Sequence, residues 1–484
     1  MIITMSEKTC KNCGAALNES MRFCEKCGVM VEQSEPPPPQ EFQQYPPPVY
    51  MQPQEKQKIL PVIIVAISVV AGIVLLTFVA WQLFLSLANE TPARPVESTE
   101  TPIATPAPEP TPEVTSEDEP EDVTYITIQG EQYSTSLTTL YLSELNLNDD
   151  DIAQLVHMTY LEDLNLSYNN ISDLSPLANL TSLVYLDLWS NQVEDISPLA
   201  NLTNLEWLSI TYNRVEDISP LANLTNLELL SLGSNRISDI EPLSNLLNLE
   251  WLTMGDNQIE DITPLANLTN IHFLQLWSNR ISDMTVIENL EWLEHLDMTH
   301  NRISDISALT YLVNLVELGM RDNRISDLTP LENLSRLEYM DFSENEISDL
   351  SPISNLWRLE YLSLWGNEIS DLGPLARLNN LIELDMCSNQ ISNISPLANL
   401  TSLVTLCLFN NQISDLRPLA NLTTLEDLDL CDNQITDISH LANLTNLVAL
   451  CLMNNQVTDW SPVAHVEDVE GRPQNWRTDD EGEV

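Results

Sequence analysis

The sequence is poor in basic residues, and those it has are unevenly distributed. Its 484 residues include 19 lysines and arginines against 72 aspartates and glutamates, a net charge of −53. Every lysine lies at or before Lys58, and the rest of the chain carries 13 basic and 65 acidic side chains. A field of this sign repels nucleic acid phosphates and anionic membrane surfaces, so it excludes nucleic acid as a partner and favours basic or neutral ones. The alternative is that the acidity only keeps an exported protein soluble.

Charge is absent between Lys58 and Glu90, and residues 59–87 are almost wholly apolar. Because a helix needs about 20 apolar residues to cross a bilayer, this run predicts one transmembrane helix. Lys56 and Lys58 precede the run and acidic residues follow it, which predicts a cytoplasmic N-terminus and an external C-terminal part. A cleaved signal peptide is the alternative, but its apolar region would be shorter and nearer the N-terminus.

Motifs of kinases, nucleotide-binding proteins and proteases are lacking, and no base, nucleophile and orienting group recur at a recognisable spacing. The sequence therefore predicts that the chain is not an enzyme. A metalloenzyme that uses the later cysteines or the neighbouring His272, His295 and His300 is a weak alternative.

Cys10, Cys13, Cys24 and Cys27 follow the spacing C-x2-C-x10-C-x2-C, and each pair ends in Cys-Gly. Four thiolates coordinate Zn2+ tetrahedrally and leave no open position, so residues 8–30 are expected to form a small structural zinc ribbon. Two disulfides are the alternative, which a reducing cytoplasm disfavours.

Two segments have compositions that cannot bury a core. Residues 31–58 are rich in proline and glutamine, and residues 88–122 are rich in proline, threonine and glutamate. We expect the first to be an extended linker and the second a disordered stalk outside the membrane.

From Leu161 onward the chain follows a 22-residue repeat with the unit LxxLxLxxNxIxDIxPLxxLxx. A 24-residue starter copy precedes the repeats from Leu137, with Leu145 where asparagine belongs. The fourteen regular copies are marked by their anchor asparagines: Asn169, Asn191, Asn213, Asn235, Asn257, Asn279, Asn301, Asn323, Asn345, Asn367, Asn389, Asn411, Asn433 and Asn455. Because one coil cannot bury its own leucines, the copies must stack.

The unit predicts an α/β-type solenoid, a curved leucine-rich-repeat parallel sheet with a convex side of short 3-10 helices and turns. The LxLxx segment supplies a strand whose leucines point inward, and the asparagine amide can pair with backbone groups in the turn. In ISPL, serine is expected to cap the helix and proline to occupy its first turn. The solenoid should span 137–466, with a β-hairpin cap at 123–136 that turns near Gly130 and an acidic tail at 467–484.

An aspartate recurs in each unit, from Asp173, Asp195, Asp217 and Asp239 onward to Asp459. Like charges at this spacing repel unless each one accepts local hydrogen bonds, so we expect these side chains to cap turns. Calcium binding along the ladder is the alternative. Asn393 replaces one aspartate, which suits capping better than a cation site.

The unit with N-x-I-x-D-I-x-P-L resembles the internalin-type repeats of Gram-positive bacterial surface proteins, over about residues 137–466. The resemblance implies adhesion or protein recognition through the concave face. The chain differs from that family by lacking an LPxTG wall-sorting motif and by its expected hairpin in place of a helical cap.

Side chains that alternate with the inward leucines should form the concave surface. Many of them are aromatic, and five of the ten tryptophans of the chain are among them. Exposed aromatic patches usually mark interaction sites, although aromatic residues also stack across strands for structural reasons. The predicted ligand-binding residues are Tyr185, Trp189, Trp207, Tyr212, Trp251, Phe273, Trp277, Tyr339, Tyr361 and Trp365.

An arginine row after the anchor asparagines is expected to offset neighbouring acids rather than to contact a ligand. Its members are Arg214, Arg236, Arg280, Arg302 and Arg324.

Four more cysteines, Cys387, Cys407, Cys431 and Cys451, fall on the concave face in successive copies. They alternate between two positions of the unit, so neighbours would have Cα atoms about 8 Å apart, beyond disulfide reach. We therefore expect free thiols.

Together these features predict a single-pass protein of the bacterial cell membrane, whose external repeat domain recognises a protein, peptide or glycan. The alternative is a transmembrane sensor or scaffold that couples external binding to a cytoplasmic partner of the zinc ribbon.

Overall fold

The computed structural model describes residues 8–9, 16–17 and 124–473. The apolar run, the four cysteines predicted to bind zinc, the linker and the stalk lie outside the described residues. No helix within the described ranges is long and apolar enough to cross a membrane. The chain divides into two compact units, residues 1–113 and 114–484, and in the first of these β1 (Lys8–Thr9) pairs antiparallel with β2 (Ala16–Leu17).

The second unit begins with the hairpin that the sequence predicts. β3 (Tyr125–Ile128) pairs antiparallel with β4 (Glu131–Ser134) across Gln129 and Gly130, which both have positive φ, 47° and 91°. Two such residues give the turn whose twist matches a hairpin, and glycine adopts that conformation without strain. Ile126 and Ile128 are buried, so the hairpin covers the first end of the core.

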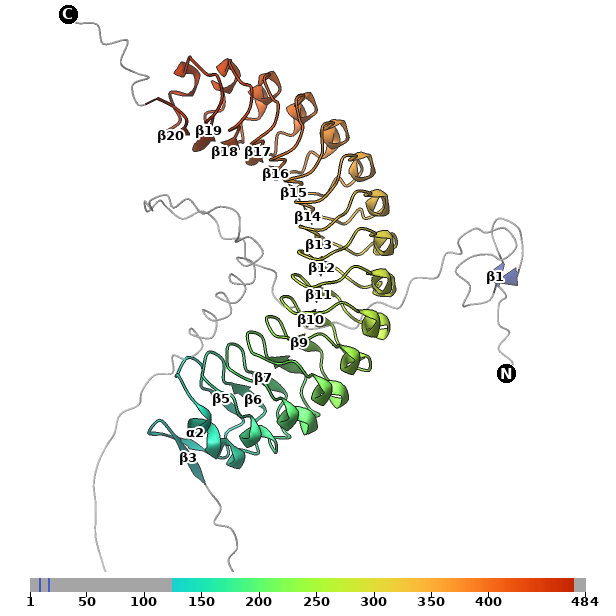
Figure 1. Ribbon diagram of the computed structural model, residues 1–484, viewed down its shortest axis with the longest axis vertical. Helices are drawn as coiled ribbons and strands as arrows, with labels where there is room; N and C mark the ends of the chain where they lie inside the picture. Colours follow the sequence, from blue (N-terminus) through green and yellow to red (C-terminus); the bar gives the residue numbers. More distant parts are fainter. Residues whose placement is uncertain (1–7, 10–15, 18–123, 474–484) are drawn as a thin grey trace, which may run out of the picture. The chain divides into compact units, whose positions relative to one another are not determined.

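The unit continues as one sixteen-stranded parallel sheet, in which each strand pairs with its neighbours in the sequence (Figure 1). The strands are β5 (Thr139–Tyr141), β6 (Asp163–Asn165), β7 (Tyr185–Asp187), β8 (Trp207–Ser209), β9 (Leu229–Ser231), β10 (Trp251–Thr253), β11 (Phe273–Gln275), β12 (His295–Asp297), β13 (Glu317–Gly319), β14 (Tyr339–Asp341), β15 (Tyr361–Ser363), β16 (Glu383–Asp385), β17 (Thr405–Cys407), β18 (Asp427–Asp429), β19 (Ala449–Cys451) and β20 (Asp468–Glu470). They line the inner side of an arc, as the predicted solenoid requires (Figure 1).

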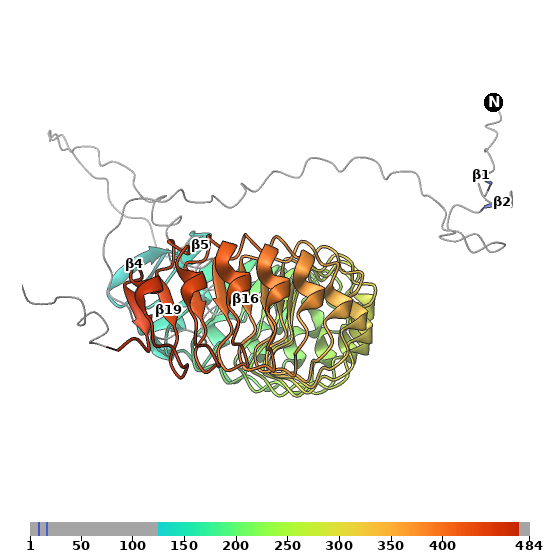
Figure 2. The same ribbon diagram turned by 90° about the horizontal axis from the view of Figure 1, so that it is seen from above.

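The outer side of the arc carries short helices. After α2 (Asp149–Ile152) these are the 3-10 helices η1 (Ala153–His157), η2 (Ser175–Leu177), η3 (Ser197–Asn201), η4 (Ser219–Asn223), η5 (Glu241–Leu243), η6 (Thr263–Asn267), η7 (Thr285–Asn289), η8 (Ser307–Leu309), η9 (Thr329–Leu331), η10 (Ser351–Ile353), η11 (Gly373–Arg377), η12 (Ser395–Asn399), η13 (Arg417–Asn421), η14 (Ser439–Leu441) and η15 (Ser461–Val463). Figure 2 shows the coils stacked side by side with these helices aligned.

The recurring aspartates cap these helices. In η2 to η15 the first N–H of each helix donates to the side chain two residues earlier, at 2.8–3.1 Å, and Asn393 takes this role before η12. The predicted capping role of the ladder is therefore confirmed. The expectation that serine is the cap was wrong, because serine is already the first helical residue, while proline does occupy the first turn.

The capping hydrogen bonds also stabilise the negative charges of the aspartate ladder. The backbone N–H of Ser197 lowers the pKa of Asp195, and that of Ser439 lowers the pKa of Asp437. Within the described ranges, no group of three or more potential metal ligands lies along the ladder. Local hydrogen bonds thus compensate these carboxylates.

The anchor asparagines tie successive coils together. Asn323 is typical: its Oδ1 accepts from Ile303 N at 2.9 Å and its Nδ2 donates to Met298 O at 3.0 Å, both in the preceding coil. Its Nδ2 also lies 3.1 Å from Met320 O in its own coil. The repeated leucines and isoleucines are fully buried in one continuous core. The predicted roles of asparagine and leucine are both confirmed.

The C-terminal end of the sheet extends beyond the predicted solenoid. β20 pairs parallel with β19, so the acidic tail does not begin at residue 467 as expected. The register joins Leu450 to Val469, so this last copy is shorter than the regular unit, and valine replaces leucine there. The shortened copy without its leucines explains why the repeat pattern missed this strand.

Candidate ligand-binding face

Three side chains per coil project from the inner side of the arc. We call them the first row (the residue that opens each strand), the second row (the residue that closes it) and the third row (two residues beyond the strand). In β7 these are Tyr185, Asp187 and Trp189, and Leu186 and Leu188 between them are fully buried. The alternation assumed in the sequence analysis is therefore present.

The first row contains three stacks of rings, which are separated by Leu229 and Glu317. Its members from β7 to β15 are Tyr185, Trp207, Leu229, Trp251, Phe273, His295, Glu317, Tyr339 and Tyr361. Ring centroids are 4.0 Å apart for Tyr185–Trp207, 3.4 Å for Trp251–Phe273, 4.0 Å for Phe273–His295 and 4.3 Å for Tyr339–Tyr361, all nearly parallel. These separations are shorter than the usual strand spacing of about 4.8 Å because side chains on a concave surface converge.

His295 and Leu229 belong to this row, although they are not among the predicted ligand-binding residues. The same 22-residue register would have found both. His295 Nδ1 lies 2.6 Å from Glu317 Oε2, and this hydrogen bond lowers the pKa of the Glu317 carboxyl. His300 instead bonds to Asp322, so within the described part of the chain the three histidines do not converge on a metal site.

In the third row, contacts with neighbouring residues hold the aromatic side chains in place. Trp189 lies between Tyr168 and Tyr212, with ring centroids 4.7 and 6.3 Å away. Trp277 covers Gly255, where an added Cβ would come within 2.2 Å of the indole, so glycine is needed for this placement.

The third row continues toward the C-terminus through charged and aromatic neighbours. The guanidinium of Arg321 lies 5.1 Å from the ring of Trp365 and donates to Glu344 at 3.2 Å. Phe409 occupies the same row, and neither it nor Arg321 was included in the predicted face. The predicted face was therefore incomplete at this end, although the 22-residue register assigns both residues to it.

The second row places carboxylates between the aromatic rows. Asp187, Asp297, Asp341, Asp385 and Asp429 each accept a hydrogen bond from the N–H two residues later, at 2.9–3.0 Å. Burial nevertheless dominates, and it raises the pKa of Asp187 to about 6 and that of Asp297, Asp341 and Asp385 above the ordinary value. Partly desolvated carboxylates flanked by rings form a surface suited to hydrogen-bond donors and cations.

The remaining predicted residues are exposed to different degrees. Tyr212 and Trp251 are 55% and 38% exposed, whereas the other eight predicted residues are only partly exposed. The structure thus brings the ten residues onto one surface, in two groups around β7–β11 and β14–β15. Whether they bind a ligand stays a prediction.

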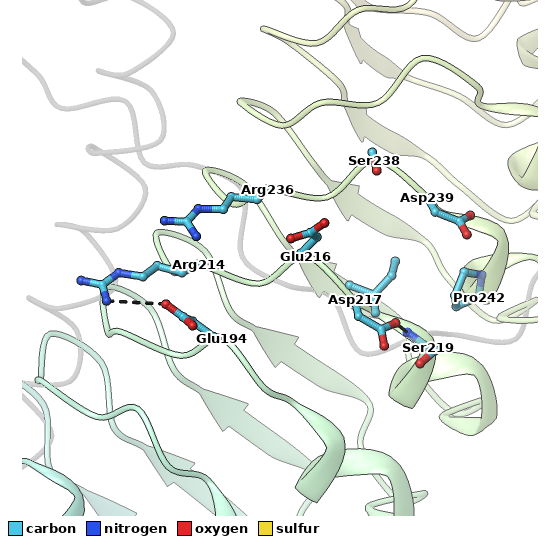
Figure 3. Close-up of a pocket in the computed structure, with 10 residues that line it drawn as sticks. Glu194, Arg214, Glu216, Asp217, Ser219, Arg236, Ser238, Asp239 and Pro242 are labelled. Atoms are coloured by element: carbon cyan, nitrogen blue, oxygen red, sulfur yellow. Dashed lines mark hydrogen bonds and ion pairs between the residues drawn. The ribbon is translucent and has the colours of Figure 1, made fainter.

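The arginine row lies outside this face. Arg214 Nη1 lies 3.8 Å from Glu194 Oε1, and Arg280 Nη1 lies 3.9 Å from Glu260 Oε1. All four side chains are exposed. Arg214 and Arg236 line a shallow pocket together with the capping residues Asp217 and Asp239 (Figure 3). For Arg214 and Arg280, the expected role of offsetting acids is confirmed.

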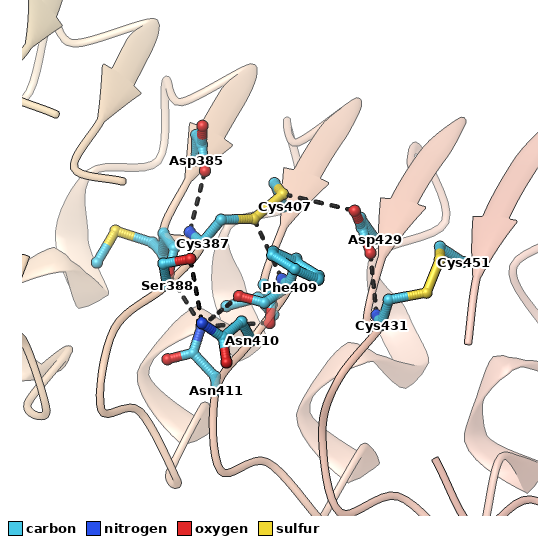
Figure 4. Close-up of a disulfide and its surroundings, with 12 residues drawn as sticks. Asp385, Cys387, Ser388, Cys407, Phe409, Asn410, Asn411, Asp429, Cys431 and Cys451 are labelled. Atoms are coloured by element: carbon cyan, nitrogen blue, oxygen red, sulfur yellow. Dashed lines mark hydrogen bonds between the residues drawn. A yellow bond between two sulfur atoms is a disulfide. The ribbon is translucent and has the colours of Figure 1, made fainter. Parts of the chain in front are cut away.

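The expectation of free thiols was wrong. Cys387 is joined to Cys407, and Cys431 to Cys451, with Cα separations of 5.6 and 5.3 Å (Figure 4). The longer separation expected from the sequence assumed that the strand continues straight, but β16 ends at Asp385 and Ser388 already has a φ of +54°. Since the chain turns here, Cys387 approaches the neighbouring strand, and Met386 N donates to Cys407 O at 2.9 Å.

Comparisons with known proteins agree with this architecture. A family model described as leucine-rich repeats in two copies matches residues 159–201, 203–245, 247–289, 291–333, 335–377, 379–421 and 423–465. It is the model of a repeat scaffold and not of an enzyme. No curated protein matches the chain.

Solved structures give a second comparison. The crystal structure of an internalin (inlF) from Listeria monocytogenes is 37% identical, with a TM-score of 0.60, and the match covers 62% of this chain and 89% of that one. A leucine-rich-repeat protein of Leptospira interrogans is 26% identical, with a TM-score of 0.61, over 67% of this chain and 88% of that one. The functional domain of InlJ from Listeria monocytogenes, described as including a cysteine ladder, is 21% identical with a TM-score of 0.58, over 67% and 75% of the two chains, which shows the fold alone.

Proposed function

Since the chain belongs to the leucine-rich-repeat family and is similar in structure to internalins, we propose that its repeat domain is an adhesion scaffold that binds a partner on the concave face. The observation that carries the proposal is the concave surface itself, where the stacked rings of the first row and the tryptophans of the third row share one face with the buried or half-buried carboxylates of the second row. Tryptophan and tyrosine are the preferred anchors of protein interfaces.

The chemistry of the face favours a protein or peptide over a glycan. Sugars stack on open ring faces, but in the first row most ring faces are covered by neighbouring rings, for example in Trp251–Phe273–His295. The edges and polar atoms that remain suit amide and cationic groups. The strongly acidic charge favours a basic or neutral partner, and it aids the approach of a basic one.

Peptides selected from a random library on the full chain should bind at least tenfold more weakly to Trp207→Ala/Trp251→Ala, because interface anchors contribute about 2 kcal/mol or more each. Trp292→Ala/Tyr311→Ala is the matched control, since these side chains are 59% and 80% exposed but lie in turns before the strands. Equal affinity for the wild type and the first variant would contradict the proposal.

We propose further that residues 59–87 anchor the chain in the bacterial membrane with the repeats outside and a zinc ribbon, holding Zn2+ on Cys10, Cys13, Cys24 and Cys27, in the cytoplasm. The charge pattern around the apolar run supports the orientation. The paired cysteines of the repeat domain also support it, because disulfides persist in oxidising compartments.

Two measurements test this arrangement. Protease added to intact cells should degrade the repeats and spare an N-terminal epitope, and the reverse pattern would contradict the orientation. The chain purified without reductant should contain one zinc ion, which Cys13→Ser/Cys24→Ser should lose. Zinc content that is unchanged in this variant would exclude the ribbon.

A second candidate function is that of a sensor that reports external binding to a cytoplasmic partner. The position of the four-cysteine motif on the other side of the apolar run from the repeats favours it. Chemical cross-linking in cells should then capture a partner on the N-terminal segment of the wild type but not of Cys13→Ser/Cys24→Ser. Identical cross-links in both would favour a passive anchor.

A further inference from the structure

The two disulfides of the concave face each lie beside a carboxylate, and the arrangement occurs twice. The Sγ atoms of Cys387 and Cys407 and a carboxylate oxygen of Asp385 all lie within 4.8 Å of one another. Asp429, Cys431 and Cys451, each two coils further on, form the same group within the same limit (Figure 4). The repeat geometry has therefore built one constellation of potential metal ligands in two places.

A second carboxylate faces each sulfur pair from the next coil. Cys407 Sγ lies 3.9 Å from Asp429 Oδ2, and Cys451 Sγ lies 3.5 Å from Glu470 Oε2. Two carboxylates thus lie beside each cysteine pair, and Asp429 lies beside both pairs. Neither Asp385 nor Asp429 forms an ion pair with an arginine of the described residues, and the Ser363 hydroxyl donates to Asp385 Oδ2 at 3.4 Å.

The redox state of the sulfurs decides what such a group can bind. A disulfide is a poor metal ligand, whereas two thiolates with carboxylate oxygens form a donor set that suits tetrahedral Zn2+. A dithiol reductant breaks the S–S bond, supplies two electrons and two protons to give two thiols, and is itself oxidised to a disulfide. A divalent metal then displaces the two thiol protons as it binds.

We propose that each reduced cysteine pair of the concave face binds one zinc-class divalent ion, with Asp385 and Asp429 as oxygen ligands of the first and second sites. The metal and the disulfide are alternative states of the same two cysteines. The Cα separations of 5.6 and 5.3 Å keep each pair on adjacent coils, so binding needs only rotation of side chains and not a change of fold.

The test uses the full chain with Cys10, Cys13, Cys24 and Cys27 replaced by serine, so that only the concave cysteines remain, and Co2+ as the probe. After reduction and removal of the reductant, titration should give sulfur-to-metal charge-transfer bands that saturate at two Co2+ per chain. The oxidised chain should give no such bands. Absence of these bands from the reduced chain would overturn the proposal.

Variants separate the two sites and the role of the carboxylates. Cys387→Ser/Cys407→Ser should lower the stoichiometry from two to one and leave the circular dichroism spectrum of the oxidised chain unchanged. Asp429→Asn should weaken Co2+ binding at least tenfold, whereas Glu426→Gln, an exposed acid of the same coil, should not. Equal affinities of Asp429→Asn and Glu426→Gln would overturn the assignment of the carboxylate ligand.

Discussion

Replacement of an anchor asparagine by alanine should open the solenoid locally at the coil that carries it. Asn323 is 8% exposed and links two coils: its Oδ1 accepts from Ile303 N, and its Nδ2 donates to Met298 O. Asn323→Ala leaves Ile303 N buried without its acceptor, whereas Met298 O keeps a hydrogen bond from Asn301 Nδ2 at 3.0 Å. The unpaired N–H costs about 1–3 kcal/mol and each further lost hydrogen bond about 1 kcal/mol, so we expect a loss of about 3 kcal/mol.

The effect should be confined to the neighbouring coils, because each repeat of a solenoid contacts only the next ones. Hydrogen exchange with mass spectrometry is therefore a better assay than global unfolding. A loss of about 3 kcal/mol corresponds to exchange about 100-fold faster in the segment that contains Ile303. Asn333→Ala, at an exposed asparagine, is the matched control. Exchange that differs less than threefold between the two variants would show that the Asn323 amide does not hold the two coils together.

Three further predictions concern other parts of the face. Gly255→Ala should displace the Trp277 indole and increase its oxidation in radical footprinting several-fold, whereas Gly233→Ala, whose nearest contact is 3.4 Å away, should not. The pKa of Asp187 is raised to about 6 in the folded chain, so its protonation contributes stability at low pH that is lost as the pH rises through 6. As the pH falls from 7 to 4, the free energy of unfolding of the wild type should therefore rise by up to about 3 kcal/mol more than that of Asp187→Asn, as measured by denaturation. An identical pH dependence of the two proteins would contradict this. Each disulfide joins cysteines 20 residues apart, so reduction of both should destabilise the coils of β16–β19 by about 3 kcal/mol per disulfide. Hydrogen exchange should then become faster in β16–β19 and stay unchanged in β7–β10.

The sequence was sufficient to predict the solenoid because the repeat leaves few alternatives. Leucines at fixed positions can be buried only if every coil stacks in the same register, and the anchor asparagine has one place in that stack. The same register assigns Tyr185, Trp207 and Trp251 to one surface, as the structure has them. These inferences depend only on the repeat period, which can be read directly from the sequence.

The errors arose where local backbone geometry departs from an ideal strand or helix. The turn after β16 shortens the distance from Cys387 to Cys407, which strand spacing alone could not predict. The helix cap moved from Ser197 to Asp195 because the helix starts one residue earlier than the proline suggested. The stacking of His295 on Phe273 depends on the curvature of the sheet, and a sequence does not state curvature.

Oxidation footprinting of the tryptophans shows whether the partner contacts the inner side of the arc. With a selected peptide bound to the full chain, we expect protection of Trp207, Trp251 and Trp277, and unchanged oxidation of Trp292 and Trp357, which are 59% and 54% exposed away from the strands. Protection of Trp292 and Trp357 with the three concave tryptophans unaffected would show that the partner binds elsewhere.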